Sequence, residues 1–598
     1  MMIQDYIKMF LIKSRKASTN QLYTKWGEER RSKTLTEYPR PQLKRDSYIP
    51  LNGLWNYAIT KNAKFPQHYD GRIVVPFSPE SILSRVNKQV MPKDYLWYER
   101  KFNVKELREN SRLILHFGAV DQYARVFVNR KKAMSHTGGY LPFSIDITDM
   151  LVKGKNEIHV MARDLSDTSY HCRGKQKLLR GGMFYTAQSG IWQSVWMEWV
   201  PDYYIKSLRI TPLYEESMVQ LEITMNGRKE EADAPVWIQV TDKEQIIISK
   251  EESGNKFLIP MPGFIPWSPE NPYLYGLTVI VGEDKAESYF AMRKVEVKKD
   301  EEGTLRIFLN DKAYFQNGVL DQGYWPDGLY TPPTDEAMVQ DILAMKKLGF
   351  NMLRKHIKVE PLRWYYHCDR LGMLVWQDMV NGGDSYNMLF LGYLPNFFPK
   401  TAERIKDSWY SLFSRKNEKG RQEWRADMVG TIEHLYNSPC IVVWVPFNEG
   451  WGQFDAEEAV DLIKKLDPTR LIDQASGWFD QKGGDFKSIH NYFRKLRIVT
   501  EKRAVVLSEF AGFACPVTGH MFSKNIYGYK IYKDREDLEK ALHKLYKEEL
   551  PALIRKGLSA AVFTQLSDVE DEINGLMTYD RKVLKVEKLP KLPSSYNK

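Results

Sequence analysis

Short apolar runs separated by turn residues dominate the first half of the chain. Residues 45–201 carry runs of strand length, such as RLILHFGAV and ARVFVNR, and residues 202–300 continue in the same style without an amphipathic helix. Runs of this length, bounded by polar residues and glycines, are typical of strands in β-sandwiches. The pattern therefore predicts two consecutive β-sandwiches, of which the second is immunoglobulin-like.

The pattern changes near residue 301, where strand-length runs begin to alternate with amphipathic segments such as DEAMVQDILAMKKLG. Eight strand runs fit this alternation, which predicts a closed (β/α)8 TIM barrel over residues 301–598. An open doubly wound sheet is the alternative, and the lack of a glycine-rich phosphate loop after the first strand disfavours it. The eight runs are AYFQNGVL, FNMLRKH, MLVWQD, CIVVWVPFNE, RLIDQAS, KSIHNY, RAVVLSE and SAAVFTQ.

The distribution of charge adds an N-terminal segment to this picture. The formal net charge is +11, and residues 1–45 contribute +7 of it, with eleven Lys or Arg against four Asp or Glu. The rest of the chain is nearly balanced, so we predict a solvated basic extension over residues 1–44, with neither a nucleic-acid nor a membrane partner. Lysines interrupt the apolar stretch at the N-terminus, and the four cysteines form no metal-ligand pattern. Both features predict a cytoplasmic protein with reduced thiols.

Two glutamates end predicted barrel strands. Glu449 closes CIVVWVPFNE, the fourth strand, and Glu509 closes RAVVLSE, the seventh. Catalytic groups of a TIM barrel lie at the carboxyl ends of its strands, so both side chains are expected to face one mouth. Two carboxyl groups about 5–5.5 Å apart suit retaining glycoside hydrolysis, in which one attacks and the other exchanges protons. The residues alone leave a structural role open, because such glutamates are more often salt-bridge partners or neighbours of a helix N-cap.

The sequence around these glutamates resembles glycoside hydrolase family 2, which includes β-galactosidases, β-glucuronidases and β-mannosidases. NSPCIVVWVPFNEG is similar to the family's acid/base motif, and VVLSEFAG is similar to its nucleophile strand. The resemblance implies that Glu449 is the acid/base and Glu509 the nucleophile. Two carboxylates this close resist ionising together, so we expect the acid to have a raised pKa. SGIWQSVWMEW, LNGLWNY and WYERKF resemble the family's sugar-binding sandwich, which implies a jelly-roll over residues 45–201.

The resemblance also implies a set of substrate contacts. Asn448 takes the position that binds the sugar's 2-hydroxyl, His356 faces the sugar, and Tyr492 supports the nucleophile. Trp325 is a candidate stacking platform and Asp167 a candidate contact from a long polar loop, although a turn role stays open for both. A core histidine is the alternative for His356. The full set of expected contacts is Asn448, His356, Tyr492, Asp378, His490, Trp325 and Asp167.

These features together predict a retaining exo-β-glycosidase that hydrolyses terminal β-linked sugars of small glycosides or oligosaccharides, with β-galactosides first. No Asn-x-Lys string can be assigned to the motif by which β-glucuronidases recognise a sugar carboxylate, so a glucuronide is the second choice. The Glu and His that bind magnesium in some β-galactosidases are also missing, and we expect neither a metal nor a cofactor. A non-catalytic carbohydrate-binding protein and a transglycosylase remain alternatives, and a homo-oligomer is compatible with the size.

Overall fold

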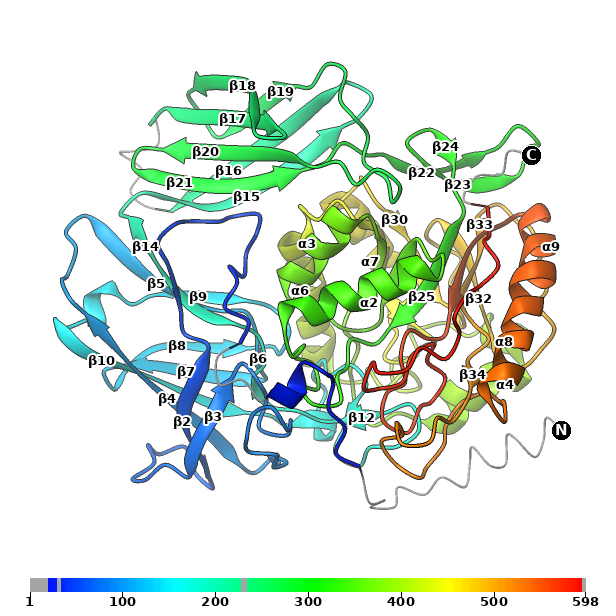
Figure 1. Ribbon diagram of the computed structural model, residues 1–598, viewed down its shortest axis with the longest axis horizontal. Helices are drawn as coiled ribbons and strands as arrows, with labels where there is room; N and C mark the ends of the chain where they lie inside the picture. The colour runs from blue at the N-terminus through cyan, green and yellow to red at the C-terminus, as the bar shows by residue number, and fades with distance from the viewer. Residues whose placement is uncertain (1–19, 30–33, 227–233, 594–598) are drawn as a thin grey trace.

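Three bodies of structure lie side by side in the protein (Figure 1). The computed structural model describes residues 20–29, 34–226 and 234–593. Blue and cyan strands at the left form the first sandwich, green strands at the top form the second, and the barrel fills the right-hand side. Within these described ranges no helix is long and apolar enough to cross a membrane.

The first sandwich follows from the alternation of apolar and polar residues along its strands. Every second residue of β7 is buried, so one face of the strand packs into a core shared by two antiparallel sheets. The sheet orders are β3-β2-β4-β10-β7-β8 and β1-β14-β5-β9, with the short pairs β6/β13 and β11/β12 beside them. The strands are β1 (Tyr48–Pro50), β2 (Gly53–Thr60), β3 (Gly71–Val75), β4 (Tyr95–Val104), β5 (Ser111–Phe117), β6 (Val120–Asp121), β7 (Tyr123–Val128), β8 (Lys131–Thr137), β9 (Phe143–Asp146), β10 (Gly154–Arg163), β11 (Gln176–Lys177), β12 (Tyr185–Thr186), β13 (Gly190–Ile191) and β14 (Val195–Pro201).

The second sandwich has sheets of order β15-β16-β19 and β18-β17-β20-β21, and its core is separate from that of the first. Strict alternation of burial along β20 again places one face inward. A small sheet, β22-β23-β24, then leads into the barrel. The strands are β15 (Tyr204–Leu213), β16 (Met218–Asn226), β17 (Val236–Asp242), β18 (Gln245–Glu252), β19 (Lys256–Pro260), β20 (Tyr275–Val281), β21 (Asp284–Phe290), β22 (Val295–Lys299), β23 (Leu305–Leu309) and β24 (Lys312–Ala313).

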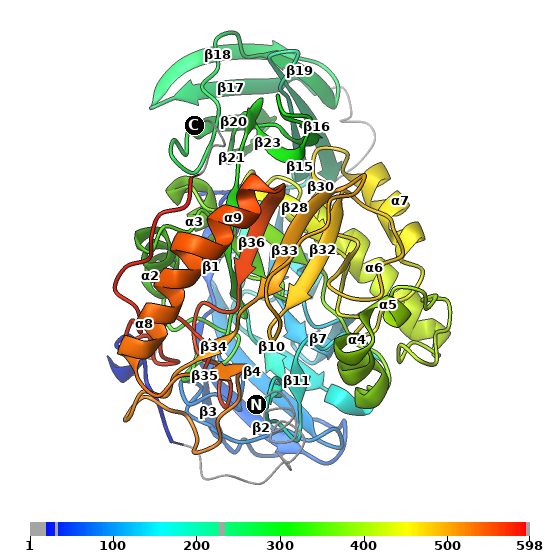
Figure 2. The same cartoon turned by 90° about the vertical axis from the view of Figure 1, so that its right-hand side faces the viewer.

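All eight predicted barrel strands are present, and their ladder pairings are parallel. The order is β30-β28-β27-β26-β25-β36-β33-β32, and β29 (Phe447–Asn448) and β31 (Ala475–Ser476) pair beyond β28 and β30. Figure 2 shows β36, β33 and β32 running side by side. Continuous apolar runs such as IVVWV are buried on both faces, as expected between a barrel interior and covering helices. The strands are β25 (Gln316–Asp321), β26 (Met352–Lys355), β27 (Leu374–Asp378), β28 (Ile441–Val445), β30 (Leu471–Ile472), β32 (Phe486–Asn491), β33 (Ala504–Phe510) and β36 (Leu558–Phe563).

Side-chain caps fix where several barrel helices begin. Thr334, Asn417 and Asp534 each accept a hydrogen bond from a backbone N–H of the first turn that follows them. The helices are α2 (Asp335–Lys347), α3 (Leu362–Leu371), α4 (Leu394–Phe397), α5 (Pro399–Ala402), α6 (Glu418–Leu435), α7 (Ala456–Leu466), α8 (Arg535–Lys544) and α9 (Leu550–Arg555), with π-helical turns η5 (Leu389–Tyr393) and η6 (Leu545–Glu549) and 3-10 turns η1 (Gly27–Glu29), η2 (Thr148–Met150) and η3 (Ser166–Thr168).

The N-terminal segment is packed where the structure describes it, so the prediction of a solvated extension is wrong there. Thr24 donates two hydrogen bonds to the buried Asp327 of the barrel, at 2.8 and 2.7 Å. Arg40 pairs with Glu198 of the first sandwich at 2.8 Å. Trp26 is buried as well, so apolar contacts and paired charges together hold the segment in place. Residues 1–19 and 30–33 of the predicted extension lie outside the described residues.

Candidate active site

The two strand-end glutamates lie beside each other at the mouth of the barrel, which the carboxyl ends of the strands form. Glu509 belongs to β33, and Glu449 directly follows β29. The Tyr492 hydroxyl bridges them, 3.1 Å from Glu449 Oε1 and 2.6 Å from Glu509 Oε2. One oxygen of each carboxylate lies within 4.8 Å of the other. This spacing suits direct attack by one carboxylate, whereas a mechanism with water between the two groups needs about 6.5–9.5 Å.

Two neighbours fix the carboxylate of Glu449. His490 Nδ1 lies 2.7 Å from Oε1, and the Trp451 indole donates to Oε2 at 3.2 Å. Glu449 itself has φ 53°, a strained left-handed conformation of the kind that functional sites retain. Burial acts to raise the pKa of Glu449, but the hydrogen bond and charge of His490, together with the Trp451 hydrogen bond and the Lys175 charge, outweigh it, and the pKa is lowered. The sequence predicted a raised pKa for the acid/base, and this prediction is wrong for Glu449 beside His490.

Arg354 on β26 holds the second carboxylate, although the sequence did not indicate it as a site residue. Its Nη1 donates to Glu509 Oε1 at 3.2 Å, and its Nη2 donates to Asn448 Oδ1 at 2.9 Å. Its Nε and Nη2 also form a forked pair with Asp378 at 2.9 and 3.0 Å. A fully buried guanidinium needs such partners, because an unpaired buried charge is strongly unfavourable. Arg354 therefore joins the ends of β26, β27, β29 and β33 into one charged network.

His356 has one free ring nitrogen at this site. Its Nδ1 lies 2.8 Å from Asp378 Oδ2, and burial holds the pKa of His356 well below its usual value. The ring is therefore neutral, and its Nδ1 donates to the Asp378 carboxylate. The buried Nε2 and both side-chain polar atoms of Asn381 make no hydrogen bond with any described residue. Because buried polar groups are seldom left unpaired, these atoms are suited to contact substrate hydroxyls.

Two expected contacts, Trp325 and Asp167, have partners within the protein. Trp325 is 4% exposed, and Trp26 and the Arg581 guanidinium lie 6.4 and 4.2 Å from its ring centroid. Its ring is covered, so the predicted stacking platform is wrong. Asp167 in η3 is half-buried and accepts the Leu178 backbone N–H at 3.1 Å, which fits a turn role, and its contact with substrate stays a prediction. The remaining expected residues form one hydrogen-bonded network: Glu449, Glu509, Asn448, His356, Tyr492, Asp378 and His490.

A loop of the first sandwich reaches this mouth. The backbone N–H groups of Arg173 and Gly174 donate to Asn381 O at 3.0 and 2.8 Å, and a Cβ at Gly174 would lie 3.0 Å from Ile357 O. The next residue, Lys175, has no carboxylate partner among the residues that the structure describes. After burial, its charge is the largest influence on the pKa of His356, which it lowers. The charge of a residue from a different domain thus acts on this site, an influence that only the fold reveals.

Metal binding at this site would compete with existing partners. In the described ranges, three groups bring three ligand atoms together: Glu99, Glu157 and His159; Cys172, Glu423 and Asp427; and Glu449, His490 and Glu509. Each group already contains a paired carboxylate, with Arg130 on Glu157 at 3.3 Å, His171 on Glu423 at 2.7 Å and Arg354 on Glu509 at 3.2 Å. The cationic partners already balance the charge of these carboxylates without a metal ion. That the protein needs no metal stays a prediction. The four cysteines are buried and unpaired, which confirms free thiols.

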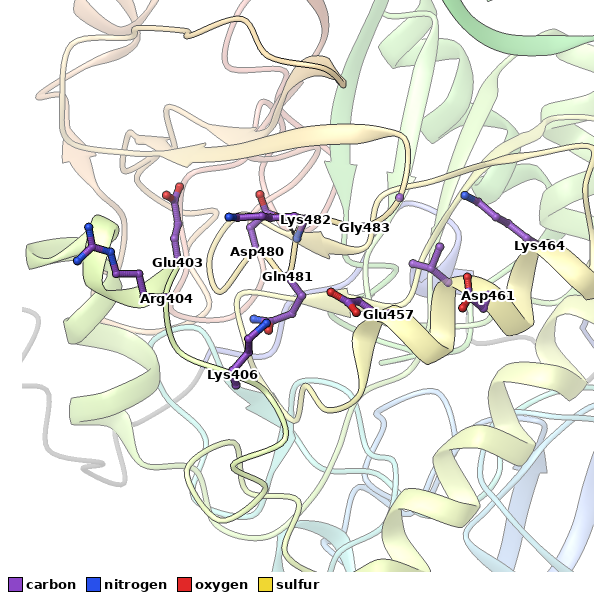
Figure 3. A pocket seen from close by; sticks show the side chains of 12 residues that line it. Glu403, Arg404, Lys406, Glu457, Asp461, Lys464, Asp480, Gln481, Lys482 and Gly483 are labelled. Atoms are coloured by element: carbon purple, nitrogen blue, oxygen red, sulfur yellow. Dashed lines mark hydrogen bonds between the residues drawn. The ribbon is translucent and has the colours of Figure 1, made fainter.

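A separate open hollow of about 580 Å³ lies beside α7, and Figure 3 shows the side chains that line it. Its walls carry both signs of charge, including Glu403, Glu457, Lys464 and Lys482. None of its lining residues belongs to the network around the two glutamates. Chemistry, rather than the size of this hollow, therefore identifies the candidate site at the barrel mouth.

Sequence models of one family match three consecutive parts of the chain. The model described as Glycosyl hydrolases family 2, sugar binding domain, matches residues 58–201. Glycosyl hydrolases family 2 matches residues 203–293, and Glycosyl hydrolases family 2, TIM barrel domain, matches residues 306–511. The three matches follow the two sandwiches and the barrel in order.

Individual relatives carry more than one activity in their names. The chain is 24% identical over 452 residues to a β-galactosidase of Thermoanaerobacter pseudethanolicus, covering 71% of this chain and 55% of the relative. It is 22% identical over 462 residues to a β-glucuronidase of Streptococcus agalactiae, covering 72% of each. The chain thus spans about half the length of the first relative, and only 35% of the β-galactosidase of Lactococcus lactis.

Solved structures share the whole architecture. A β-D-glucuronidase from Dictyoglomus thermophilum superposes with a TM-score of 0.70 at 18% identity, covering 94% of this chain and 100% of that one. A β-galacturonidase from Eisenbergiella tayi gives a TM-score of 0.66 at 20% identity, covering 93% and 96%. Identities this low establish a common fold, and the chemistry has to be argued from the site.

Proposed function

The chain belongs to glycoside hydrolase family 2, and from this premise we propose that it is a retaining exo-β-glycosidase with Glu509 as nucleophile and Glu449 as acid/base. The spacing of the two carboxylates carries the proposal, since their oxygens lie within 4.8 Å of each other beside Tyr492. At this distance one carboxylate reaches the anomeric carbon while the other reaches the leaving oxygen. The substrates would be terminal β-linked sugars of small glycosides or oligosaccharides.

The first step forms a covalent glycosyl ester. Glu509 attacks the anomeric carbon, the glycosidic C–O bond breaks, and the proton of Glu449 moves to the leaving oxygen. Arg354 and Tyr492 donate hydrogen bonds to Glu509, at 3.2 and 2.6 Å, and so stabilise its ionised form before attack. They also stabilise the carboxylate when it is released again.

The second step reverses the roles of the two groups. Glu449, now ionised, takes a proton from a water that attacks the anomeric carbon from the face the leaving group vacated, and Glu509 departs. Two inversions give overall retention. The amide of Asn448, held by Arg354 at 2.9 Å, and the free Nε2 of His356 are placed to bind sugar hydroxyls. Contacts to hydroxyls accelerate the reaction where they tighten in the transition state.

Replacing His490 with asparagine is expected to move the basic limb of the kcat/KM profile to higher pH. Glu449 must be protonated to act as an acid, so activity falls as pH rises through its pKa. Burial raises this pKa and His490 lowers it, so removal of the imidazole leaves burial dominant and the pKa increases. The measurement is kcat/KM for one aryl β-glycoside across the pH range of the folded enzyme.

The matched control for this shift is Ser476→Ala. The Ser476 hydroxyl lies 3.0 Å from His490 Nε2, on the far side of the ring from Glu449. Its loss leaves the imidazole beside the carboxylate and should move the basic limb less. A basic limb that stays in place, or moves to lower pH, in His490→Asn would contradict the proposed pairing.

The identity of the sugar is the finer part of the proposal. The sequence favours a β-galactoside, because no Asn-x-Lys string that could be the motif of β-glucuronidases follows Glu509. One observation supports a β-uronide as second candidate: the Lys175 ammonium, 5.6 Å from the Tyr185 centroid, has no carboxylate partner among the described residues, and its charge lowers the pKa of both His356 and Glu449. Lys175 is half-buried. A cation in such a place without a carboxylate partner favours a substrate that brings a carboxylate. The glycosidase proposal holds for either sugar.

Release of p-nitrophenol from a panel of aryl β-glycosides tests both the glycosidase activity and the identity of the sugar. The panel contains the β-galactoside, β-glucuronide, β-galacturonide, β-glucoside and β-mannoside. If a uronide is the substrate, Lys175→Met should reduce kcat/KM for it by about 10- to 100-fold, the range for losing one charged hydrogen bond. Neutral glycosides should change little. Lys105→Met, which changes an exposed lysine of the first sandwich outside this loop, is the control.

Each outcome of the panel favours a different function or substrate. Equal losses on neutral and acidic sugars in Lys175→Met would remove the uronide candidate and leave the β-galactoside. Binding of these sugars without turnover would favour the non-catalytic carbohydrate-binding alternative. Products that carry the released sugar on a second sugar would favour transglycosylation, which differs only in the group that resolves the intermediate.

A further inference from the structure

Three aromatic rings extend from the acid/base side of the carboxylate pair. The first belongs to Trp451, whose indole donates to Glu449 Oε2. Tyr386 and Phe184 meet it edge-on, with 5.1 and 6.0 Å between ring centroids, and they stack on each other at 6.3 Å. The rings come from the loop after β29, the loop after β27 and the first sandwich. We call Trp451, Tyr386 and Phe184 the aromatic wall.

The turn η5 continues this wall towards solvent. A Cβ at Gly392 would lie 3.9 Å from the Trp451 ring, so the turn packs against the wall. Leu389 at its start is 70% exposed, and Phe398 just after α4 is 61% exposed. Arg494 donates to Asn396 O at 2.5 Å and ties this segment to the loop that carries Tyr492. This segment therefore contacts both Trp451 and the loop that carries Tyr492, and it exposes apolar side chains beside the site.

The wall consists mostly of ring surface, with the Lys177 ammonium 5.2 Å from the Phe184 centroid at its edge. The Trp451 N–H is used by Glu449, and the Arg173 guanidinium, 4.9 Å from the Tyr386 centroid, donates to Asp384 O at 3.4 Å. A sugar bound here would cover hydroxyls with apolar surface and lose their hydration without replacement. An aromatic group would instead gain edge and face contacts.

We infer that the aromatic wall is the leaving-group subsite, and that it selects β-glycosides of aromatic aglycones over those of sugars. The inference rests on the proposed function, because the group that Glu449 protonates must lie against that carboxylate. His490 and Tyr492 already occupy Oε1, at 2.7 and 3.1 Å. Oε2 has one partner, the Trp451 indole at 3.2 Å, against two on Oε1, so Oε2 is the oxygen with more room to face the leaving group.

The test compares methyl, benzyl and disaccharide β-glycosides that carry the same glycosyl unit. Benzyl alcohol is a poorer leaving group than a sugar hydroxyl, so intrinsic reactivity works against the expected result. We expect kcat/KM for the benzyl glycoside to exceed that for the disaccharide by about tenfold, the worth of one good aromatic contact. Phe184→Ala should raise KM for the benzyl glycoside about tenfold and leave the methyl glycoside unchanged.

Trp409→Ala is the control, since Trp409 is an exposed aromatic of the same insertion between β27 and α6, in a hollow that contains no wall residue. It should leave all three substrates unchanged. A benzyl glycoside no better than the disaccharide, or equal losses on methyl and benzyl glycosides in Phe184→Ala, would overturn the inference while the glycosidase stands. Failure of the wild type on all three, and on the aryl panel, would overturn the proposed function and the inference with it.

Discussion

Replacing Glu509 with glutamine is expected to reduce kcat for every substrate by about four orders of magnitude or more, the scale seen when a catalytic nucleophile is removed. Glutamine has nearly the volume of glutamate, and its carbonyl oxygen can still accept from Arg354 Nη1, which lies 3.2 Å from Oε1. The amide cannot form a glycosyl ester, so the covalent route is closed. Arg354 keeps its forked pair with Asp378, and the fold should survive.

The measurement is single-turnover and steady-state release of p-nitrophenol, with thermal unfolding to verify that the variant is folded. A second readout is independent of rate. A 2-fluoro glycoside with a good leaving group forms the ester faster than water resolves it, and mass spectrometry then locates the sugar on a peptide. The label should fall on the peptide with Glu509 in the wild type and disappear in Glu509→Gln. A label on another peptide, or a variant with most of its activity, would show the assignment to be wrong.

The barrel could be predicted from the sequence because its strands are buried on both faces. Runs such as IVVWV and AVVL have no polar interruption, and eight of them alternate with amphipathic segments, which few architectures besides a closed barrel accommodate. The N-terminal segment could not be predicted in this way. Its basic residues suggested a solvated extension, yet Trp26 and Arg40 find partners far along the chain, at Trp325 and Glu198. Local charge does not reveal such long-range pairing.

The residues of the candidate site also fall into those that the sequence could predict and those that it could not. Glu449 and Glu509 could be placed from sequence because each ends a strand, and strand ends of a barrel converge by geometry. Arg354 was missed, although an arginine inside a buried strand run is itself a signal, because burial requires counter-charges. Lys175 gives no such signal. Its loop belongs to the first sandwich, and contacts of Arg173 and Gly174 with the barrel loop that carries Asn381 bring it to the site.

Glu449→Ala is expected to lose activity in proportion to how much the leaving group needs a proton. With a benzyl or methyl glycoside, kcat/KM should fall by about three orders of magnitude, within the usual range for a general acid. With a p-nitrophenyl glycoside the leaving group departs without a proton, so the ester on Glu509 still forms. Its hydrolysis then becomes rate-limiting, because no base activates water. A burst of p-nitrophenol followed by slow turnover is the expected trace.

Azide separates this role from a structural one. A small anion can occupy the space that the Glu449 carboxylate leaves beside Tyr492 and His490, and it attacks the ester without a base. We expect azide to raise the slow turnover of Glu449→Ala by about tenfold or more and to yield a β-glycosyl azide, because attack comes from the face opposite Glu509. Glu509→Gln, which forms no ester, should not give this product. Turnover that azide leaves unchanged in Glu449→Ala would contradict the acid/base role, and an α-glycosyl azide would contradict a retaining ester on Glu509.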